Sequence, residues 1–346
     1  MLNKFGYLNN KRWSSDSRAR NFATRVGLDL NTQTHEPCGH WHKRNITIAE
    51  TCYSDDIFAF DTPCEYPSFI CTDGDYLYFL ARDAVLPFPV VYTYTFTGTF
   101  VSSFQVLINP SSDDGMAVSD AHIYITGPAY IGATVDYAHV AKYLKDGTFV
   151  TAWATHIGVN HYTPKGICYH DGAVYVSTGG CLFKFDTAGN TLWTNLNYGG
   201  AVGQFGTANS MIVVNNILYM ADYTYSRVVM FDIVSGAVIG QSSYMVPASP
   251  NGIANIGNRI YIPPSTAVYI FDMNVTYICH AAWIDTIFYI PGSGMFGNLV
   301  SYGGYLYATY RNGAIGNEGI VKFKPYQTGD PIGYDNYPDE PQIWPM

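Results

Sequence analysis

A short motif, an aliphatic residue followed by tyrosine, recurs along the chain at intervals of 42 to 51 residues. The copies are Leu77-Tyr78, Ile123-Tyr124, Val174-Tyr175, Leu218-Tyr219, Ile260-Tyr261 and Leu306-Tyr307. Their tyrosines lie 46, 51, 44, 42 and 46 residues apart. A fixed period of this length indicates a repeat architecture, in which each repeat is one small unit that packs against its neighbours.

The clearest repeat, residues 166–200, reads as four short strands. Each strand is rich in β-branched or aromatic residues and is bounded by Gly, Asp or Asn, which is typical of an antiparallel meander. The expected strands are Gly166–His170, Ala173–Ser177, Cys181–Asp186 and Thr191–Leu196. Four strands per repeat favour the β-propeller. The sequence therefore predicts an all-β, six-bladed β-propeller of four-stranded antiparallel blades.

The third strand of a repeat ends in a second motif, Phe-Asp followed by a turn. The clear copies are Phe185-Asp186, Phe231-Asp232 and Phe271-Asp272, with degenerate forms at Phe96-Thr97, Tyr143-Leu144 and Phe323-Lys324. Glycines follow in several copies, at Gly98, Gly147, Gly189 and Gly236. An Asp that bonds its own backbone and a Gly with positive φ make a tight turn. We therefore expect turn-forming aspartates here and not catalytic acids.

The two ends of the repeat region indicate how the ring closes. The final repeat offers only the strands Asn298–Ser301, Tyr305–Tyr310 and Gly319–Lys324 before Pro325, which cannot readily continue a ladder. Asp55–Asp61 resembles a lone strand, so residues near 52–61 are expected to supply the missing fourth strand and remove an exposed edge. A seventh, partial blade is the alternative. The long second repeat predicts an exposed loop over Gly127–Tyr137, a candidate for binding.

Charge divides the chain into three parts. Residues 1–50 hold eight basic and four acidic groups, a net of +4, and are expected to form an extended basic arm. Residues 51–324 form the propeller, and residues 325–346 form a Pro-rich acidic strap. Beyond residue 50 the chain holds 10 basic and 23 acidic groups, a net of −13, which disfavours nucleic acid on the propeller itself.

Cysteine and histidine leave some questions open. We expect Cys168, Cys181 and Cys279 to be buried, and the amino-terminal group of Cys38, Cys52, Cys64 and Cys71 to be free thiols, although a disulfide there is an alternative. His35, Cys38, His40 and His42 have the types of zinc ligands, but no second ligand pair follows, so a metal there stays open. No apolar run is long enough to span a membrane, and no signal peptide is evident.

The strand starts Pro164-Lys-Gly-Ile167 and Pro250-Asn-Gly-Ile253, followed by the Tyr and Phe-Asp motifs, resemble the NHL-repeat class of six-bladed propellers. The resemblance covers residues 52–324. Such propellers serve as lyases, lactonases, RNA-binding modules and scaffolds, so it implies architecture more than function.

The resemblance also implies where a metal would lie, because the enzymes of this group hold one in the central channel with acidic, Asn or His residues of the innermost strands. Those strands begin here at Ser68-Phe69, Asp114-Gly115, Lys165-Gly166, Asn209-Ser210, Asn251-Gly252 and Gly297-Asn298. One Asp, three Asn and one Lys suit a divalent cation poorly. We therefore expect no cofactor, no metal and no catalytic residue.

These features favour a non-enzymatic structural or binding component of a large assembly, most specifically a tail or capsid-associated protein of a phage or virus particle. It would be made in the cytoplasm without a signal peptide and reside in the particle. The arm and the strap would contact other protein subunits, with Arg12, Trp13, Arg18, Arg20 and Arg25 as the candidate partner-binding residues.

Two alternatives from other classes stay open. One is a propeller-type lyase or lactonase with a metal in the channel. The other is a carbohydrate- or receptor-binding propeller, in which aromatic rings stack on sugar faces. Its candidate residues are Tyr130, Tyr137, Tyr162 and Tyr223.

Overall fold

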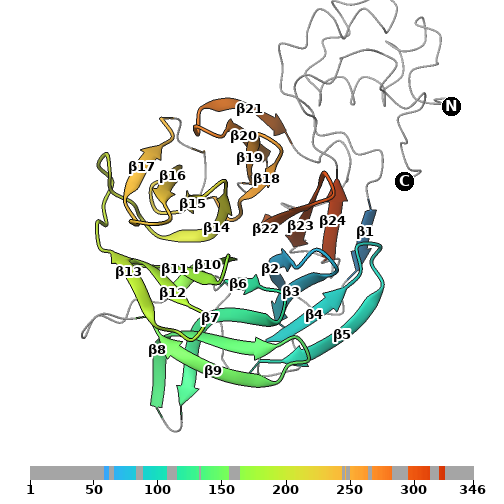
Figure 1. The fold of residues 1–346 in the computed structure, drawn as a ribbon. Coiled ribbons are helices and arrows are strands. Elements are labelled where there is room, and N and C mark those ends of the chain that lie inside the picture. The colour runs from blue at the N-terminus through green and yellow to red at the C-terminus, as the bar shows by residue number, and fades with distance from the viewer. Residues whose placement is uncertain are drawn as a thin grey trace, which may run out of the picture.

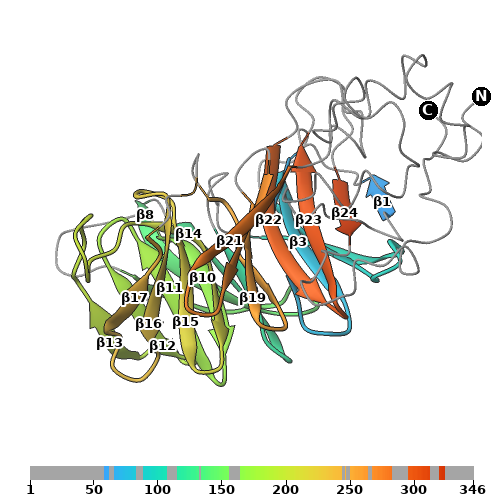
Figure 2. The same ribbon diagram turned by 90° about the horizontal axis from the view of Figure 1, so that it is seen from above.

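The structure, a computed structural model, describes residues 58–61, 66–82, 89–106, 115–131, 134–155, 164–243, 246, 250–263, 267–282, 295–311 and 319–323. These residues form six antiparallel four-stranded sheets arranged as blades around a central axis (Figure 1). Figure 2 views the same ring from the side, where the strands run between its two faces. Within the described residues there is no helix, and so none that could cross a membrane.

The strands follow the chain order from the innermost to the outermost position of each blade, except that β1 completes the last blade. Blades 1 to 3 contain β2 (Tyr66–Thr72), β3 (Leu77–Arg82), β4 (Val90–Tyr94) and β5 (Phe100–Gln105); β6 (Met116–Val118), β7 (His122–Ile131), β8 (Thr134–Leu144) and β9 (Phe149–Ala154); and β10 (Pro164–His170), β11 (Ala173–Thr178), β12 (Leu182–Asp186) and β13 (Thr191–Asn195). Blades 4 to 6 contain β14 (Ala208–Val214), β15 (Ile217–Asp222), β16 (Arg227–Asp232) and β17 (Val238–Gln241); β18 (Ala254–Ile256), β19 (Arg259–Ile262), β20 (Ala267–Asp272) and β21 (Tyr277–Ala282); and β22 (Met295–Tyr302), β23 (Tyr305–Arg311), β24 (Gly319–Phe323) and β1 (Phe58–Asp61).

The repeated tyrosines form the core between blades. Tyr78, Tyr124, Tyr175, Tyr219, Tyr261 and Tyr307 are each at most 2% exposed. Each lies on the second strand of its blade, where alternate side chains pack against the neighbouring blade. This burial explains why the motif recurs, because every blade needs one large side chain to fill the same space.

Lysines of the third strands add polar contacts between blades. Lys142 and Lys184 lie over the rings of Tyr124 and Tyr175, with Nζ 5.9 and 5.4 Å from the ring centroids. Their Nζ atoms donate to backbone carbonyls of the following blade, at Thr187 and Ile233, each at 2.9 Å. The ammonium groups are therefore paired while their stems cover tyrosine.

The Phe-Asp motifs form turns, as predicted. Asp186 Oδ1 accepts the N–H groups of Ala188 and Asn190 at 2.9 and 2.8 Å. Asp232 and Asp272 accept backbone N–H groups in the same way. Gly98, Gly147, Gly189 and Gly236 have φ between 73° and 90°, which a residue with a Cβ rarely adopts.

In blade 1, the sequence places the degenerate Phe-Asp motif at Phe96-Thr97, but the structure places it at Tyr94-Thr95, two residues earlier. Tyr94 pairs with the first residue of the outer strand, as Phe185 does in blade 3. Thr95 then replaces the aspartate, because its Oγ1 accepts the Thr99 N–H at 3.0 Å. Phe96 lies in the turn itself and stacks on Tyr302 of blade 6, with ring centroids 3.9 Å apart.

The insertion in blade 2 is not the loop that its length predicts. β7 and β8 continue as a long hairpin that projects from the ring at the lower edge of Figure 1. Backbone pairing extends to Ile131 and Thr134. The run is rich in β-branched and aromatic residues, which extend a ladder more readily than they form a loop.

The ring contains six blades, so the alternative of a seventh partial blade is wrong for the described residues. β1 pairs with β24 in the register Phe58↔Lys322 to Asp61↔Gly319, at the place where the sequence analysis expects a closing strand. Cys168 and Cys181 are buried free thiols, as expected, and Cys71 is also a free thiol. The side chain of Cys279 lies outside the described residues.

Candidate functional site at the connector face

The two faces of the ring have different loops. The chain enters each innermost strand from a connector between blades, and the turn from the second to the third strand lies at the same end because neighbouring strands are antiparallel. We name this end the connector face. The opposite end, with the turns from first to second and from third to fourth strands, is the turn face.

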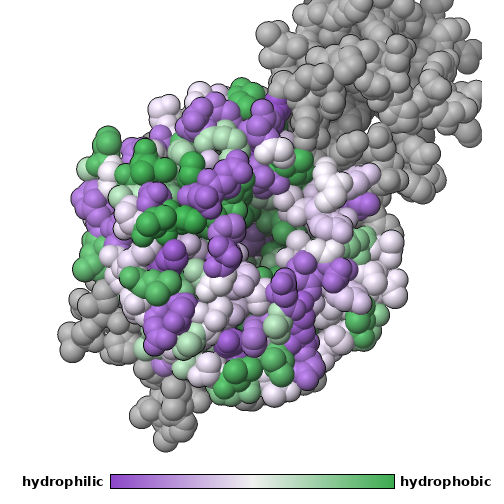
Figure 3. Space-filling model, in the orientation of Figure 1, coloured by the Kyte–Doolittle hydropathy of each residue, from purple (hydrophilic) through white to green (hydrophobic). Residues whose placement is uncertain are grey.

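Amide side chains from three blades meet where the innermost strands begin at the connector face. Asn209 Nδ2 donates to Asn251 Oδ1 at 3.2 Å, and Ser210 Oγ donates to Asn298 Oδ1 at 3.3 Å. The ring is hollowed at its centre in Figure 3. Asn209 is only 7% exposed, and its Oδ1 accepts no hydrogen bond from the described residues. The channel mouth is therefore polar, largely neutral, and has one buried acceptor without a protein donor.

Close approach of the innermost strands depends on glycine at two of these starts. A Cβ on Gly115 would lie 2.4 Å from the carbonyl oxygen of Lys165, and one on Gly166 would lie 2.9 Å from that of Ala208. Thr126 Oγ1 fills the remaining space and donates to the same Lys165 carbonyl at 3.0 Å.

Lys165 and Tyr223 place a cation and an aromatic ring at the same end. Lys165 Nζ lies 5.9 Å from the centroid of the Tyr223 ring. Tyr223 occupies the turn between β15 and β16, and its N–H donates to the Thr207 carbonyl at 2.9 Å. Its ring is partly exposed, so it offers a face to a ligand or partner.

The described donors do not fit a divalent cation. Asn251 Oδ1 accepts from Asn209, and Asn298 Oδ1 accepts from both Ser210 Oγ and the Leu299 N–H. Only Asn209 Oδ1 is left, and neutral amides without carboxylates bind such ions weakly. Nowhere in the described part of the chain do three His, Cys, Asp or Glu side chains gather as a metal site. Asp114 lies outside the described residues.

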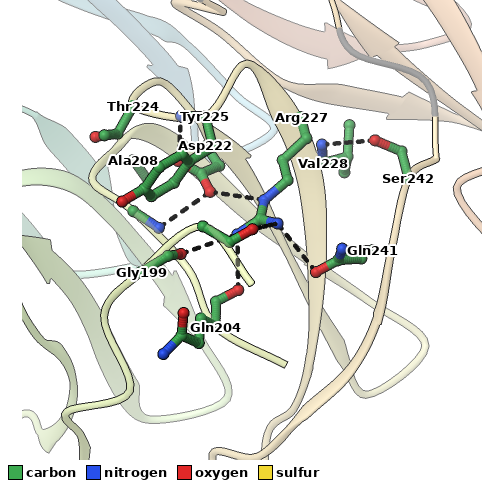
Figure 4. Close-up of polar contacts among 12 residues, drawn as sticks. Gly199, Gln204, Ala208, Asp222, Thr224, Tyr225, Arg227, Val228, Gln241 and Ser242 are labelled. Atoms are coloured by element: carbon green, nitrogen blue, oxygen red, sulfur yellow. Dashed lines mark hydrogen bonds and ion pairs between the residues drawn. The ribbon is translucent and has the colours of Figure 1, made fainter. Parts of the chain in front are cut away.

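One connector, residues 196–207 between blades 3 and 4, is joined to blade 4 by a buried arginine in addition to its own internal hydrogen bonds (Figure 4). The Arg227 side chain is almost fully buried and its Nε donates to Asp222 Oδ2 at 3.1 Å. Its remaining N–H groups donate to one side chain and three connector carbonyls: Gln241 Oε1 at 3.1 Å, and the oxygens of Gly199 at 3.1 Å, Gly200 at 3.1 Å and Gln204 at 2.9 Å. The planar guanidinium thus donates hydrogen bonds to connector carbonyls that have no neighbouring strand to pair with.

Asp222 completes this network from the end of β15. Its carboxylate also accepts the N–H groups of Gly206 at 3.0 Å and Tyr225 at 3.1 Å. Burial raises the pKa of Asp222, whereas the donated hydrogen bonds and the Arg227 charge favour its ionised form. The pair is therefore a buried ion pair with most of its hydrogen-bonding groups satisfied.

The fixed connector presents apolar side chains to solvent. Leu196, Tyr198 and Val202 are exposed, and Val202 reaches 87%. Tyr198 packs near Tyr225, with ring centroids 6.3 Å apart, and Tyr225 lies over the Arg227 guanidinium at 5.2 Å. We name Leu196, Tyr198, Val202 and Tyr223 the connector patch. It is a hydrophobic surface on a rigid support.

Most of the site residues predicted from the sequence lie outside the described part of the structure. Arg12, Trp13, Arg18, Arg20 and Arg25, the group His35, Cys38, His40 and His42, and Tyr162 lie outside the described residues, as do the side chains of Tyr130 and Tyr137. Of the aromatic candidates, Tyr223 is described and lies at the channel mouth. Sequence reasoning missed the Arg227 network. Its signal is the Gly-rich stretch 196–207 together with an acid three residues after the motif tyrosine Tyr219.

Comparison with known proteins identifies the fold and no family. No family model matches the chain, and no curated protein matches it. Among solved structures, it is similar to Raptor from Chaetomium thermophilum, with a TM-score of 0.51 and 10% identity, over 90% of this chain and 32% of that one. It is also similar to the WD40 domain of Pan2 from Neurospora crassa, with a TM-score of 0.51 and 10% identity, over 80% of this chain and 98% of that one. The chain spans about a third of the Raptor chain. The likeness supports the propeller fold.

Proposed function

We propose that this propeller is a non-enzymatic protein-binding scaffold and that the connector patch holds the partner. The Arg227-fixed connector is the observation that carries the proposal. It keeps the side chains of Leu196, Tyr198 and Val202 exposed to solvent, where they do not contribute to the packing of the propeller core. Several exposed apolar side chains on one connector are typical of an interaction site.

The rigidity of the connector supports binding to a protein. Ordering a mobile loop on association costs free energy, and a connector already held by three hydrogen bonds from Arg227 avoids part of that cost. Tyrosine and aliphatic side chains are the usual anchors of such interfaces.

The more specific form of the proposal is a building block of a phage or virus particle. The basic arm and the acidic strap would contact neighbouring subunits, with Arg12, Trp13, Arg18, Arg20 and Arg25 as the first residues to substitute. The opposite charges of arm and body support it. The NHL-type subclass of the propeller and residence in the particle stay predictions of the sequence.

The test begins with the native assembly state. Fractionation of the source material by size, with detection of the chain by mass spectrometry, should place it with a partner in fixed stoichiometry. In the reconstituted complex, Val202→Asp should weaken binding at least about tenfold, because it places a charge in an apolar interface. Val234→Asp is the matched control, since Val234 is 79% exposed but lies on the turn face. A chain that runs as a free monomer, or equal effects of the two substitutions, would contradict the proposal.

A second candidate is binding of a small polar ligand, such as a sugar, at the channel mouth. Tyr223 offers an exposed ring face beside the polar amides of the mouth, a combination that suits a hydroxyl-bearing ligand. Binding to a glycan array that disappears in Tyr223→Ala would support this function. The enzyme alternative instead requires stoichiometric metal and a loss of turnover in Asn251→Ala.

A further inference from the structure

The outer strands of five blades share an unusual composition. β5, β9, β13, β17 and β21 contain no Asp, Glu, Lys or Arg. The second residue of each is aliphatic and between 39% and 55% exposed: Val101, Val150, Leu192, Ile239 and Ile278. We name these five residues the rim stripe.

The register shows that the rim stripe is one structural position. In blade 3, motif Tyr175 pairs with Lys184 and Lys184 pairs with Trp193, the residue after Leu192. In blades 1, 2, 4 and 5, the motif tyrosine likewise pairs with a residue of the third strand, which in turn pairs with a residue of the outer strand. That outer-strand residue directly follows Val101, Val150, Ile239 and Ile278, respectively. The stripe therefore lies at one level around the rim.

Such edges are normally protected. An outer strand has unpaired N–H and C=O groups, and soluble proteins usually place charged residues there to prevent pairing with other strands. This chain places lysines one strand inward, at Lys142, Lys184 and Lys322, and leaves the edges uncharged, with a β-bulge at each stripe residue. Uncharged edges with exposed aliphatic side chains at one level indicate a surface that another segment covers.

The end of the amino-terminal segment identifies a candidate for that cover. In blade 6, motif Tyr307 pairs with Lys322 and Lys322 pairs with Phe58. Phe58 thus corresponds to the residue after a stripe position, so residues 1–57 join the propeller at the level of the stripe. The residue before it in the sequence is Ile57. A segment of this length reaches at most about 190 Å when extended, enough to pass several blades.

We infer that the chain's own residues 1–57 dock along the rim stripe of the same molecule, adding main-chain pairing and apolar contacts to the blade edges. The tether favours this source over a second copy, because it keeps the segment at high effective concentration. Docking by the apolar side chains leaves the basic side chains of the segment accessible. The inference concerns a different surface from the connector patch and does not depend on it.

Trypsin provides the first test on the full chain, since the segment contains Lys4, Lys11, Arg12, Arg18, Arg20, Arg25, Lys43 and Arg44. Blades 1 and 5 flank blade 6, so Val101→Lys/Ile278→Lys places a charge on whichever neighbouring edge the segment meets. We expect cleavage within residues 1–57 to become at least about tenfold faster. Val234→Lys, on the turn face, should leave the rate unchanged. Equal rates in the wild type and the double variant, or equal acceleration by the control, would overturn the inference.

A second measurement needs no substitution. Cross-linking mass spectrometry, with a photoreactive reagent that joins a lysine to any nearby residue, on an equal mixture of isotopically light and heavy full chains should give links between residues 1–57 and the edge strands β5 or β21 within one isotope class. Links of mixed class at those sites would show that the segment covers the rim of a second copy, and links to other surfaces would show that it docks elsewhere. Either result would overturn docking within the same molecule.

Discussion

The turn face and the connector face of the ring are ordered by different means. At the turn face, many loops are fixed by residues of their own turn, as when Asp186 accepts the N–H groups of Ala188 and Asn190, and separate links between turns, such as Lys145 to Asp73, add to them. At the connector 196–207, Arg227 binds groups up to 28 residues away and donates to three of the connector's carbonyls. The turn face thus spreads its stability over many small turns and separate links between them. Connector 196–207 instead gathers several of its hydrogen bonds in one ion pair, which makes it sensitive to a single substitution.

Removal of Arg227 should give the largest effect. Arg227→Met leaves Asp222 buried without its counter-ion and deprives three connector carbonyls of donors. We expect a loss of about 3–5 kcal/mol in the free energy of unfolding, measured by urea denaturation. Adding Asp222→Asn should recover part of the loss, because it removes the unpaired charge. A loss below about 1 kcal/mol would show that the connector is held by other contacts.

A turn glycine should give the next largest effect. A Cβ on Gly189 would lie 2.7 Å from the Trp153 side chain of the preceding blade, and the residue has a φ of 90°. Gly189→Ala should therefore cost about 1–3 kcal/mol. Gly172→Ala is the matched control, because Gly172 has a φ of 74° with no atom near its Cβ position, and only the backbone cost of roughly 1 kcal/mol remains. Equal losses would show that contact with Trp153 does not limit this turn.

Asp73 should make the turn face sensitive to acid. Burial opposes its charge, but hydrogen bonds from Lys145, Tyr78 and backbone N–H groups outweigh burial and lower its pKa to about 2 from an ordinary 3.8. A lowered pKa gives stability that is present above the ordinary value and is lost as the pH falls towards 2. The stability difference between wild type and Asp73→Asn should shrink between pH 5 and pH 2. A difference that stays constant would contradict this role.

The exposed turn aspartates should give the smallest effects. Asp186→Ala removes an acceptor for two backbone N–H groups that water can also reach, so we expect only a small fall in Tm by calorimetry. Asp186→Asn should recover it, because the amide oxygen accepts the same bonds. The equivalent change at Asp232 lies in another blade and should add to it independently. A synergistic loss would show that the turns are coupled.

The contrast between local turns and the long-range Arg227 contacts also explains which features could be predicted from the sequence. The six blades were predictable because Tyr175 and its equivalents fill a space that recurs in every blade, and the Phe-Asp turns because their donors and acceptors are a few residues apart. Arg227 was missed because its partners come from two distant stretches and the arrangement occurs once in the described residues. In blade 3, Thr178 occupies the position that Asp222 occupies in blade 4. The side-chain hydroxyl of Thr178 hydrogen-bonds to Cys181 in its own turn, so the Arg227 network is not part of the repeat.

The extra length of blade 2 predicts a loop over Gly127–Tyr137, and the structure has a hairpin there instead. Its extra residues continue the ladder because they pair across the hairpin, as Tyr130 does with Val135. Of the site, the channel-mouth amides Asn209, Asn251 and Asn298 were found from their places at strand starts. The hydrogen bonds that occupy two of their three oxygens depend on contacts between blades, which a single sequence does not specify.

The pairing of β1 with β24 also has a consequence for synthesis. Phe58 and Lys322 become neighbours in the sixth blade although almost the whole propeller separates them along the chain. On a ribosome, five blades are complete before residues 319–323 emerge, and until then β1 lacks its partner strand. The order of translation therefore makes ring closure the last event, and nascent chains stopped before residue 319 should carry an unpaired β1 that a chaperone or another chain can bind.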